Sequence, residues 1–305
     1  MGGDGRSLAV QVVLYDDHLD SMIRLADAVA AAARFVRDHS DVTRIVWRIG
    51  DSSRWPCLAD DAAAVLSART RGSIDEVSVT FFGANLGSGG GSNALARLGD
   101  EDLLWVLNPD TYPAPDSLWR LLDTIDRDEQ VALAESRQIP IEHQKTYDPV
   151  SGATSWACGF SVLARRSAFD SVGGFDDRFF PLYCDDVDLS WRLRLAGWKV
   201  LHVPRSVVFH DKQIDADGGV RWTPTAARSS TIAALWLYRR YGRPDLEASA
   251  LADLGRSADP VALSVLDEYH RRVADDDVPR PLEGADHVAT FVDGQFAPRR
   301  FSYVG

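Results

Sequence analysis

The stretch that decides the fold lies near the start of the chain. Residues 8–15 read LAVQVVLY, residues 19–36 read LDSMIRLADAVAAAARFV, and residues 42–49 read VTRIVWRI. The first and last of these are short, nearly continuous apolar runs, as in strands that are covered on both faces. The middle stretch repeats its apolar residues at helical spacing from Met22 onward. A strand, a helix and a strand in this order predict a parallel α/β sheet.

The same alternation continues along the first half of the chain. An Ala-rich helix is expected from about 60 to 68, followed by strands at 77–82 and at 103–107, the latter reading LLWVL. In such sheets, ligands bind beyond the carboxyl ends of the strands. The predicted strand ends are polar or contain glycine: Asp16-Asp17, Gly50-Asp51, Asn85-Leu86-Gly87 and Asn108-Pro109-Asp110. We therefore expect one shared binding site at this edge of the sheet.

Composition limits the classes of protein to consider. The chain has 305 residues, 45% of them hydrophobic, including nine Trp, which is enough for one main domain and an appendage. The net charge of -12 disfavours a nucleic-acid partner. The thiols of Cys57, Cys158 and Cys184 lack C-x-x-C spacing, which argues against a zinc site and a disulfide framework and favours the reducing cytosol. No apolar run approaches the roughly 18 residues of a membrane span, so a soluble protein is expected.

A glycine-rich segment, NLGSGGGSN at 85–93, leads into a predicted helix at 94–98. Its glycines would let backbone amides approach a ligand closely. One alternative is a dinucleotide fingerprint, but Ser92 stands where the third glycine belongs, and no acid follows on a further strand at about 20 residues. The other alternative is a surface loop that binds nothing.

Two further segments concentrate acidic residues. Asp110 directly follows a buried strand, where its carboxylate could bind a divalent cation, although Asn-Pro-Asp also favours a simple turn. Residues 173–180 read GGFDDRFF and residues 185–192 read DDVDLSWR. A buried carboxylate is unfavourable unless it is paired, hydrogen-bonded or bound to a cation, so acids among aromatic residues indicate a partly enclosed site.

Taken together, these segments resemble family 2 glycosyltransferases of the GT-A fold, in particular the bacterial rhamnosyltransferase-like and galactofuranosyltransferase-like branch. The resemblance covers roughly residues 8–210. Four segments carry it: 85–93, 107–110, 173–180, and 185–192 with Ala196-Gly197-Trp198. It implies a mostly parallel, Rossmann-like nucleotide-binding sheet flanked by helices. The catalytic domain would span 1–222, with a nucleotide-sugar half at about 1–110 and an acceptor half at about 111–222.

The resemblance also implies an activity. Such a protein would be an inverting hexosyltransferase that depends on Mn²⁺ or Mg²⁺. It would move a sugar from a UDP- or dTDP-type donor (dTDP-rhamnose, UDP-galactofuranose or a UDP-hexose) to a hydroxyl of a glycan, a lipid-linked acceptor or a small molecule. By match to the family motifs, Asp186 would be the catalytic base, and Asp185, in place of the usual Glu, its helper. Asp110 and His210 would hold the metal, with Asn108 where relatives carry the first acid of the metal motif.

Further positions match binding residues of the family. On the donor side, Asp51 would recognise the base, although the acid is shifted by one residue from the family pattern. The other donor-side positions are Tyr15, Asn85, Gly87, Asn93 and Asn108. On the acceptor side, Trp156 would stack on a sugar, and core packing explains it equally well. Asp188 and Arg192 are further acceptor-side candidates, but their i, i+4 spacing favours mutual pairing.

The resemblance does not extend to residues 223–305. Helices are expected at 225–241, 246–254 and 261–273, followed by a β-hairpin around Asp293-Gly294. This extension could cover the acceptor site, form a homodimer, or dock on the inner face of the cell membrane through Trp236 and Tyr238. Packing against the catalytic domain of a cytoplasmic protein is the favoured alternative. A catalytically inactive sugar- or nucleotide-binding protein of the same fold is the second functional hypothesis, and a dehydrogenase is the third.

Overall fold

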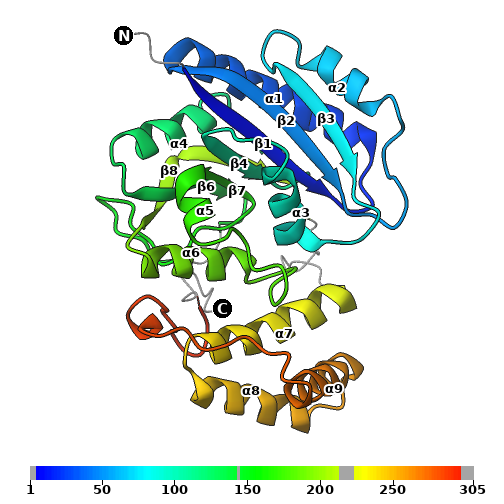
Figure 1. The fold of residues 1–305 in the computed structure, drawn as a ribbon, viewed down its shortest axis with the longest axis vertical. Helices are drawn as coiled ribbons and strands as arrows, with labels where there is room; N and C mark the ends of the chain where they lie inside the picture. Colours follow the sequence, from blue (N-terminus) through cyan, green and yellow to red (C-terminus); the bar gives the residue numbers. More distant parts are fainter. Residues whose placement is uncertain (1–4, 143–144, 213–222, 297–305) are drawn as a thin grey trace.

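The computed structural model describes residues 5–142, 145–212 and 223–296. Its first half is the predicted alternation of strands and helices (Figure 1). The elements are β1 (Arg6–Leu14), α1 (Leu19–His39), β2 (Val42–Asp51), α2 (Ala62–Arg69), β3 (Glu76–Phe81), α3 (Gly87–Ala96) and β4 (Leu103–Leu107). The four strands pair in parallel in the order β3-β2-β1-β4. Leu14 lies opposite Asp51, and Asp51 lies opposite Phe81, so the strand ends share one edge as predicted.

The second half of the sheet is mixed rather than parallel. Its elements are β5 (Thr111–Pro113), α4 (Ser117–Asp126), β6 (Val131–Ile139), β7 (Ser161–Arg165), α5 (Arg166–Ser171), α6 (Asp185–Leu195) and β8 (Lys199–His210). β7 lies antiparallel between β4 and β6, β8 is parallel to β6, and β5 is antiparallel to β8 at the edge. The α/β fold is confirmed, in one eight-stranded sheet ordered β3-β2-β1-β4-β7-β6-β8-β5.

Helices cover both faces of this sheet. Apolar residues of α1, α2 and α4 pack with one set of strand side chains, including Trp47 and Trp105. Residues of α3, α5 and α6 pack with the alternate set, which includes Val46 and Leu104. Adjacent residues of one strand thus enter different cores, because side chains alternate across a sheet.

The glycine-rich segment is helical, which corrects the prediction that the helix starts at Ala94. α3 begins at Gly87, whose φ is +69° and whose added Cβ would lie 1.9 Å from the Pro181 carbonyl oxygen. At Gly91, a Cβ would lie 2.7 Å from the Val13 side chain. Glycine is a poor helix former, but here its missing side chain lets α3 approach β1 and the 181 loop.

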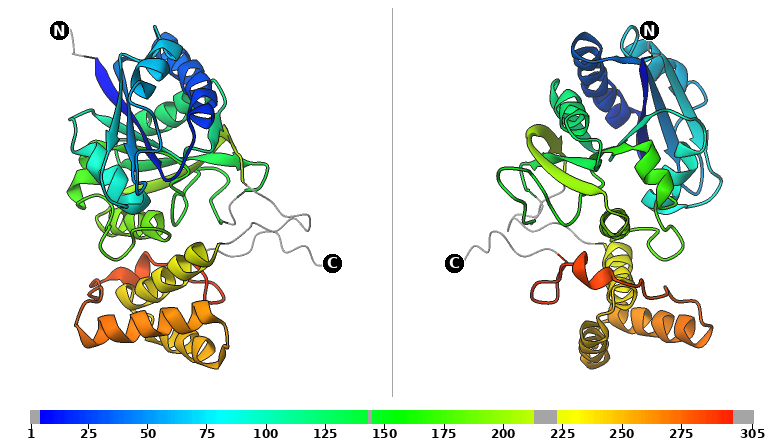
Figure 2. Two further views of the ribbon diagram at one scale, coloured as in Figure 1. Left: turned by 90° about the vertical axis from the view of Figure 1, so that its right-hand side faces the viewer. Right: turned by 60° about the vertical axis from the view of Figure 1, so that its left-hand side comes forward.

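The C-terminal extension contains α7 (Pro224–Arg240), α8 (Pro244–Arg256), α9 (Pro260–Ala274) and a short 3-10 turn at Ala285–His287. It lies below the sheet in Figures 1 and 2, against α6. One hydrophobic cluster joins Trp156, Phe180 and Trp191 to Trp236 and Tyr269 of the extension. The structure thus shows the predicted packing of the extension against the preceding part of the chain, while the predicted domain boundary at 222 lies outside the described residues.

One alternative for this extension is wrong. Trp236 and Tyr238 are buried in the shared core, so they cannot form a membrane-docking surface. At the predicted β-hairpin, Val292 and Gln295 form an antiparallel bridge around the Asp293-Gly294 turn, and the residues after 296 lie outside the described part of the chain. Across the described ranges, every helix is too short or too polar to span a lipid bilayer.

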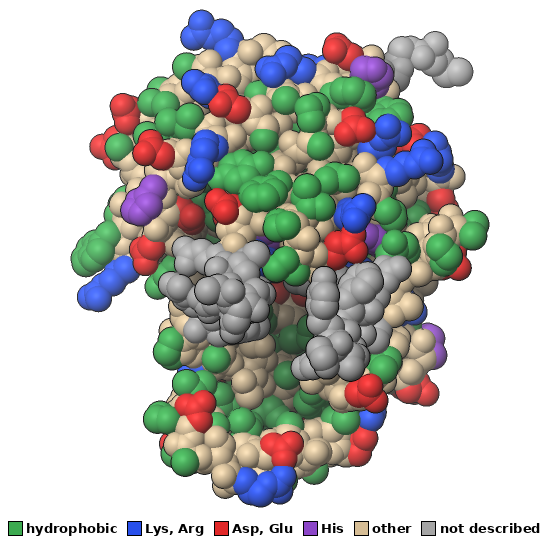
Figure 3. Space-filling view, turned by 180° about the vertical axis from the view of Figure 1, so that it is seen from behind, with side chains coloured by type: hydrophobic (Ala, Val, Ile, Leu, Met, Phe, Trp, Pro, Cys, Tyr) green, Lys and Arg blue, Asp and Glu red, His purple; other side chains and the backbone are tan. Residues whose placement is uncertain are grey.

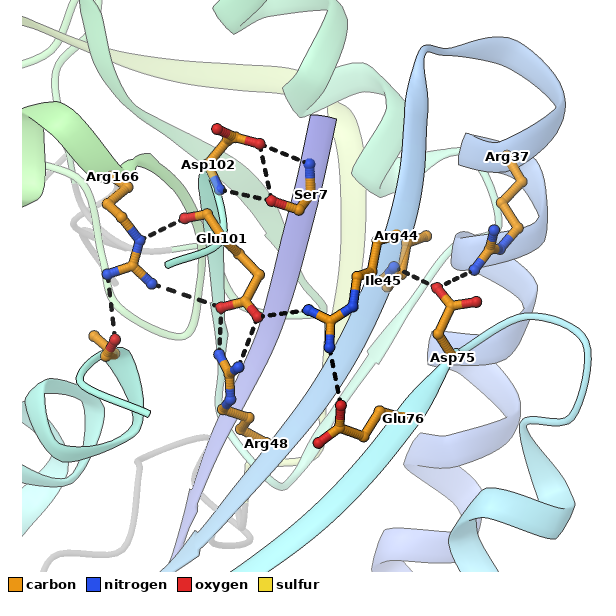
Figure 4. A network of polar contacts seen from close by, with 11 residues as sticks. Ser7, Arg37, Arg44, Ile45, Arg48, Asp75, Glu76, Glu101, Asp102 and Arg166 are labelled. Atoms are coloured by element: carbon orange, nitrogen blue, oxygen red, sulfur yellow. Dashed lines mark hydrogen bonds and ion pairs between the residues drawn. The ribbon is translucent and has the colours of Figure 1, made fainter. Parts of the chain in front are cut away.

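A network of charged residues ties the strands together at the edge opposite the strand ends (Figure 4). Glu101, buried just before β4, pairs with Arg48 of β2 and with Arg44 at 3.1 Å. The backbone NH and the hydroxyl of Ser7 both donate to Asp102 at 2.8 Å. The buried Glu101 carboxylate is thus paired and hydrogen-bonded, which offsets its loss of hydration. These contacts stabilise the edge of the sheet at which the parallel strands begin. The candidate site residues lie at the opposite edge, where these strands end.

Candidate active site

The ends of β1 and β2 form one wall of the candidate site. Tyr15 follows β1 and is 56% exposed, so its ring is available to a ligand. Asp51 is buried, and its two carboxylate oxygens accept hydrogen bonds from the backbone NH groups of Ser53 (2.9 Å) and Cys57 (2.8 Å). Burial raises the pKa of Asp51, but these hydrogen bonds outweigh it and the net pKa is lowered. This carboxylate therefore shapes the loop after β2, and its predicted contact with a base stays a prediction.

Asp17 belongs to this wall, although no role was predicted for it. Its side chain accepts a hydrogen bond from the Tyr15 backbone NH at 2.9 Å. Burial and the nearby charges of Asp110 and Asp51 raise its pKa. The acids that follow β1, β2 and β4 thus influence one another, as expected for strand ends that share an edge.

Asp110 and His210 are brought together at the second wall. Their Oδ1 and Nε2 atoms lie 3.1 Å apart. The antiparallel pairing of β5 with β8 places Thr111 opposite His210 and so carries Asp110 to the end of β8. The Asp211 backbone NH also donates to the Asp110 carbonyl at 2.8 Å. The predicted metal-binding residues are therefore neighbours, although 100 positions separate them in the sequence.

Hydrogen bonding indicates which nitrogen of His210 carries its proton. Its Nδ1 lies 2.8 Å from Oε1 of Gln138, whose Nε2 donates to the carbonyl of Ile141. An amide oxygen only accepts, so Nδ1 is the protonated nitrogen of the neutral ring. The Nε2 lone pair then faces the Asp110 carboxylate, and two such acceptors need a proton or a cation between them.

This pair fits a divalent cation that shares its coordination with a substrate. Mg²⁺ commonly binds to one or two protein carboxylates, with substrate phosphates and water as further ligands. Mn²⁺ prefers carboxylate to imidazole, but an imidazole can also be its ligand. Asp110 is half-exposed, so a ligand could reach it. Within residues 5–142, 145–212 and 223–296, no group of three or more His, Cys, Asp or Glu side chains could hold a metal ion. The described residues therefore supply only part of the ligand set of such a cation.

The second pair of candidate residues begins α6. Asp185 and Asp186 lie in its first turn, after Tyr183 and Cys184, which have left-handed backbone with φ of 66° and 55°. Ser88 of α3 donates its hydroxyl to Asp185 at 2.7 Å. The backbone NH of Gly159 donates to Asp186 at 3.0 Å. Both acids are partly buried and held from outside their own helix.

Their surroundings raise both pKa values. Burial and the adjacent charge of Asp186 raise the pKa of Asp185 to about 7. Burial also raises the pKa of Asp186, while the hydrogen bond from Gly159 and the nearby charge of Lys145 act in the opposite direction. Because the two carboxyls interact, the pair can hold one proton near neutral pH while the other carboxyl is ionised.

Lys145 is a residue of this site that the sequence did not reveal. Its buried ammonium group donates to Glu135 and, at 2.8 Å, to the carbonyl oxygen of Trp156. It also lies 4.1 Å from the centre of the Trp156 ring. Trp156 is only 4% exposed, and its ring meets Phe296 edge-on at 5.3 Å. This burial favours core packing, the alternative that the sequence also allowed for Trp156, and its stacking on an acceptor sugar stays a prediction.

A short segment joins the two pairs of candidate residues. Gly159 holds Asp186 through its backbone NH, while the next residue, Phe160, stacks its ring on His210 at 5.6 Å. The Phe160 carbonyl accepts a hydrogen bond from the Asn108 backbone NH at 3.0 Å. The Asp110–His210 pair and the Asp185–Asp186 pair are thus anchored to consecutive residues of one loop.

Three predicted binding residues have internal roles. The Asn93 amide is buried and bonds the backbone NH (3.0 Å) and carbonyl (2.8 Å) of Phe175. Asp188 is 0% exposed and accepts from Arg192 at 2.7 Å. These contacts confirm the predicted Asp188–Arg192 pairing. They favour structural roles for all three residues, and the roles of Asn93 in donor binding and of Asp188 and Arg192 in acceptor binding stay predictions. These side chains hold α3, α6 and the Gly-Gly-Phe-Asp turn (residues 173–176) together.

The remaining donor-side residues stay at the surface of the site. Asn85 is exposed, and its side-chain oxygen accepts from the Gly87 backbone NH at 2.9 Å, at the start of α3. Asn108 is partly buried, and its carbonyl accepts from the Thr111 hydroxyl at 2.6 Å. Figure 3 shows the surface hollowed between the sheet and the C-terminal helices, with acidic side chains visible in the hollow.

Comparisons with known proteins connect this geometry to a group of enzymes. No protein-family model matches the chain. The chain is 32% identical to the N-acetylglucosaminyl-diphospho-decaprenol L-rhamnosyltransferase of Mycobacterium tuberculosis, over 43% of this chain and 57% of the relative. It is 30% identical to the rhamnosyltransferase WbbL of Escherichia coli K12, over 37% of this chain and 54% of the relative. The chain therefore spans a little over half the length of the curated relatives that it matches.

Solved structures share the fold at much lower identity. The crystal structure of GalNAc-T7 with UDP, GalNAc and Mn²⁺ superposes with a TM-score of 0.61 at 14% identity, covering 90% of this chain and 56% of that one. The crystal structure of residues 1–349 of Staphylococcus aureus TarS gives a TM-score of 0.52 at 11% identity, covering 88% of this chain and 72% of that one.

Proposed function

We propose that this chain, which has the GT-A fold and is similar in sequence to bacterial rhamnosyltransferases, transfers a sugar from a nucleoside diphosphate donor to a hydroxyl acceptor. One observation carries the proposal: the Asp110–His210 pair and the Asp185–Asp186 pair are anchored to adjacent residues, Phe160 and Gly159. The first pair suits a cation that binds a diphosphate. The second suits proton transfer from an acceptor.

The names of the relatives make the donor and the acceptor more specific. Both relatives are rhamnosyltransferases, and one name includes a lipid-linked diphosphate sugar. We therefore place a dTDP-rhamnose-type donor first, with UDP-galactofuranose and UDP-hexoses as alternatives. The acceptor proposed first is a lipid-linked glycan. Tyr15, Asn85, Gly87 and Asn108 are the donor-side residues that remain accessible at the site.

The proposed reaction is a single displacement. Asp186 accepts the proton of the acceptor hydroxyl while its oxygen bonds to the anomeric carbon from the face opposite the diphosphate. The bond between that carbon and the diphosphate oxygen breaks, its electrons stay with the leaving nucleoside diphosphate, and the configuration inverts. Asp110 and His210 would hold Mn²⁺ or Mg²⁺, which would neutralise charge on the diphosphate.

Asp186 is a better base than Asp185 for a physical reason. The nearby Lys145 charge and the Gly159 NH both lower the pKa of Asp186 relative to burial alone. The pKa of Asp185 is raised to about 7, with the Ser88 hydroxyl on one of its oxygens. We therefore assign the proton-accepting role to Asp186, the carboxyl near the Lys145 charge, within a pair that shares one proton.

Replacing Asp186 with Asn tests this function directly. General base catalysis contributes about 10²–10⁴-fold, so Asp186→Asn should lower kcat by at least about 100-fold with little change in donor binding. The measurement is transfer from dTDP-rhamnose or UDP-sugars in the presence of Mn²⁺. The exposed Asp170→Asn is a matched control for loss of one charge. Transfer near the wild-type rate by a folded Asp186→Asn protein would show that the base is another group.

A second candidate function is binding without turnover. It is motivated by Asn108, which stands where relatives carry an acid, and by Asp51, whose carboxylate is occupied by backbone NH groups. A thermal-shift screen of nucleotide sugars with and without Mn²⁺ identifies the donor, because a ligand of the native state raises its melting temperature. Mn²⁺-dependent transfer or donor hydrolysis excludes the second candidate, whereas tight binding with neither reaction supports it.

A further inference from the structure

The C-terminal extension contacts the helix that carries the proposed base through one buried carboxylate. Asp188 lies in the first turn of α6 and is 0% exposed. Its Oδ1 accepts from Nη1 of Arg240 (2.9 Å) and from the Tyr241 hydroxyl (3.1 Å). Its Oδ2 accepts from Arg192 of α6 itself (2.7 Å). One of the two oxygens of Asp188 is therefore held entirely by residues at the end of α7.

Arg240 also contacts the first of the two acidic segments, residues 173–180. Its Nη2 donates to Asp176 at 2.5 Å, in the turn that precedes α6. Its guanidinium lies over the rings of Phe179 at 5.5 Å and Phe180 at 5.1 Å. A planar guanidinium with donors on both sides can hold two carboxylates in a fixed relation. Arg240 thus fixes the Gly-Gly-Phe-Asp turn relative to α6.

The start of α6 depends on such contacts for its position. Tyr183 and Cys184, directly before the helix, both have left-handed φ, a conformation that persists only where surrounding contacts impose it. Asp185, Asp186 and Asp188 share one helical turn of about 3.6 residues, so a movement of Asp188 also moves the other two. Tyr241 completes the contact, since its ring meets Trp191 of α6 edge-on at 4.7 Å.

We propose that Arg240 and Tyr241 are positioning residues for the transfer reaction, and that the extension is thereby part of the catalytic apparatus. They hold Asp188 and so fix where Asp186 meets the acceptor, without touching substrate themselves. This inference rests on the proposed function. Because near-attack geometry is sensitive to displacements of about 1 Å, loss of either contact lowers kcat and leaves donor affinity unchanged.

The chain offers a closely matched pair of variants. Tyr241→Phe removes a hydroxyl that donates to Asp188, and Tyr269→Phe removes one that donates to Glu247 at 2.5 Å. Both tyrosines are buried and pack on a tryptophan, but Glu247 lies within the extension. We expect Tyr241→Phe to lower kcat about tenfold with an unchanged donor KM, while Tyr269→Phe keeps kcat within about twofold of the wild type.

A second matched pair uses neighbouring arginines. Arg240→Lys keeps the charge but loses the planar contact with two carboxylates, whereas Arg239→Lys changes a pair with Glu247 (3.0 Å) inside the extension. We expect only Arg240→Lys to lower kcat. Hydrogen exchange of the first-turn amides of α6 should be faster in Tyr241→Phe and Arg240→Lys than in either control.

The outcomes separate this inference from the proposed function. Absence of transfer by the wild type with every donor refutes the proposed function, and amide exchange at α6 then decides the inference alone. Wild-type kcat in both Tyr241→Phe and Arg240→Lys, or equal losses in the controls, overturns the positioning role. Unchanged exchange at α6 in both variants overturns it as well.

Discussion

At the residue scale, Asp185 and Asp186 are neighbours in one helical turn, yet different groups hold them. Asp185 accepts a hydrogen bond from the Ser88 hydroxyl of α3, and Asp186 accepts one from the backbone NH of Gly159 in the loop before β7. Lys145 adds a positive charge near Asp186. These contacts give the two acids different tendencies to ionise, and that difference is the basis for assigning them different roles.

The raised pKa of Asp185 has a consequence for stability. Because this pKa rises from its ordinary value to about 7, the native chain retains a proton that the unfolded chain loses at lower pH. Between about pH 4 and about pH 7, the native state binds more protons than the unfolded state, so the free energy of unfolding falls as pH rises. Asp185→Asn abolishes this titration. Its melting temperature should therefore increase relative to the wild type between about pH 5 and about pH 8.

Thermal unfolding at about pH 5 and about pH 8, followed by fluorescence, measures the difference in melting temperature between Asp185→Asn and the wild type. The exposed Asp170→Asn is the control, and its melting temperature should keep a constant offset from that of the wild type. If the offset of Asp185→Asn were also the same at both pH values, Asp185 would titrate like an exposed carboxyl in the folded chain.

The family resemblance proposed candidate site residues, and the structure brings several of them together. Asp110, His210, Asp185 and Asp186 lie at strand or helix ends, and the structure places them in two close pairs. Lys145 gave no such signal, because its contacts with Glu135 and Trp156 arise only from the packing of distant segments. For the same reason, the burial of Asn93 could not be foreseen, whereas core packing of Trp156 and pairing of Asp188 were among the alternatives that the sequence indicated.

At the element scale, α3 shows where local propensity misleads. Its glycines predicted a loop, because glycine loses more conformational freedom in a helix than other residues do. The segment is nevertheless helical and packs closely against β1 and the loop at Pro181. A side chain at Gly87 would collide with Pro181, and one at Gly91 would collide with Val13. The parallel strands were predicted well because they are apolar on both faces. The antiparallel insertion of β7 depends on long-range pairing that no local pattern reveals.

The packing of α3 predicts the effect of a single methyl group. Gly87→Ala would place a Cβ 1.9 Å from the Pro181 carbonyl, whereas Gly72→Ala would meet nothing within 4 Å. Both glycines have positive φ, so the left-handed backbone alone should cost each variant about 1–2 kcal/mol. We expect a larger loss for Gly87→Ala, measured as the free energy of unfolding in urea, because the 181 loop must also move. If the free energy of unfolding fell equally in the two variants, the loop at Pro181 would move at no measurable cost in stability.

At the scale of the whole molecule, the sheet and the C-terminal helices share a hydrophobic core. Phe180 and Trp191 on one side pack with Leu237 and Tyr241 on the other. The ion pairs of Arg240 with Asp176 and Asp188 cross the same boundary. Composition predicted a main domain with an appendage, but the sequence could not show that buried aromatic residues from both parts form one cluster. Such a cluster couples the stability of the two parts.

Unfolding in urea should therefore be one transition for the whole chain, with loss of near-ultraviolet and far-ultraviolet signals at the same midpoint. Trp236, which is 0% exposed, tests the coupling from the side of the extension. Trp236→Ala should lower the free energy of unfolding by about 3–5 kcal/mol, since it leaves a cavity in the shared core. Trp55→Ala, at a position that is 71% exposed, should change it by less than about 0.5 kcal/mol.

The decisive measurement is hydrogen exchange of the β1 and β4 amides in Trp236→Ala, at a urea concentration below the midpoint. If the two parts unfold together, protection of these central strands falls with the stability of the variant, although Trp236 lies on α7. If the extension were an independent domain, α7–α9 would lose protection and the central strands would keep theirs. Such a result would also weaken the positioning role of Arg240, because a separately unfolding extension could not hold α6 in place.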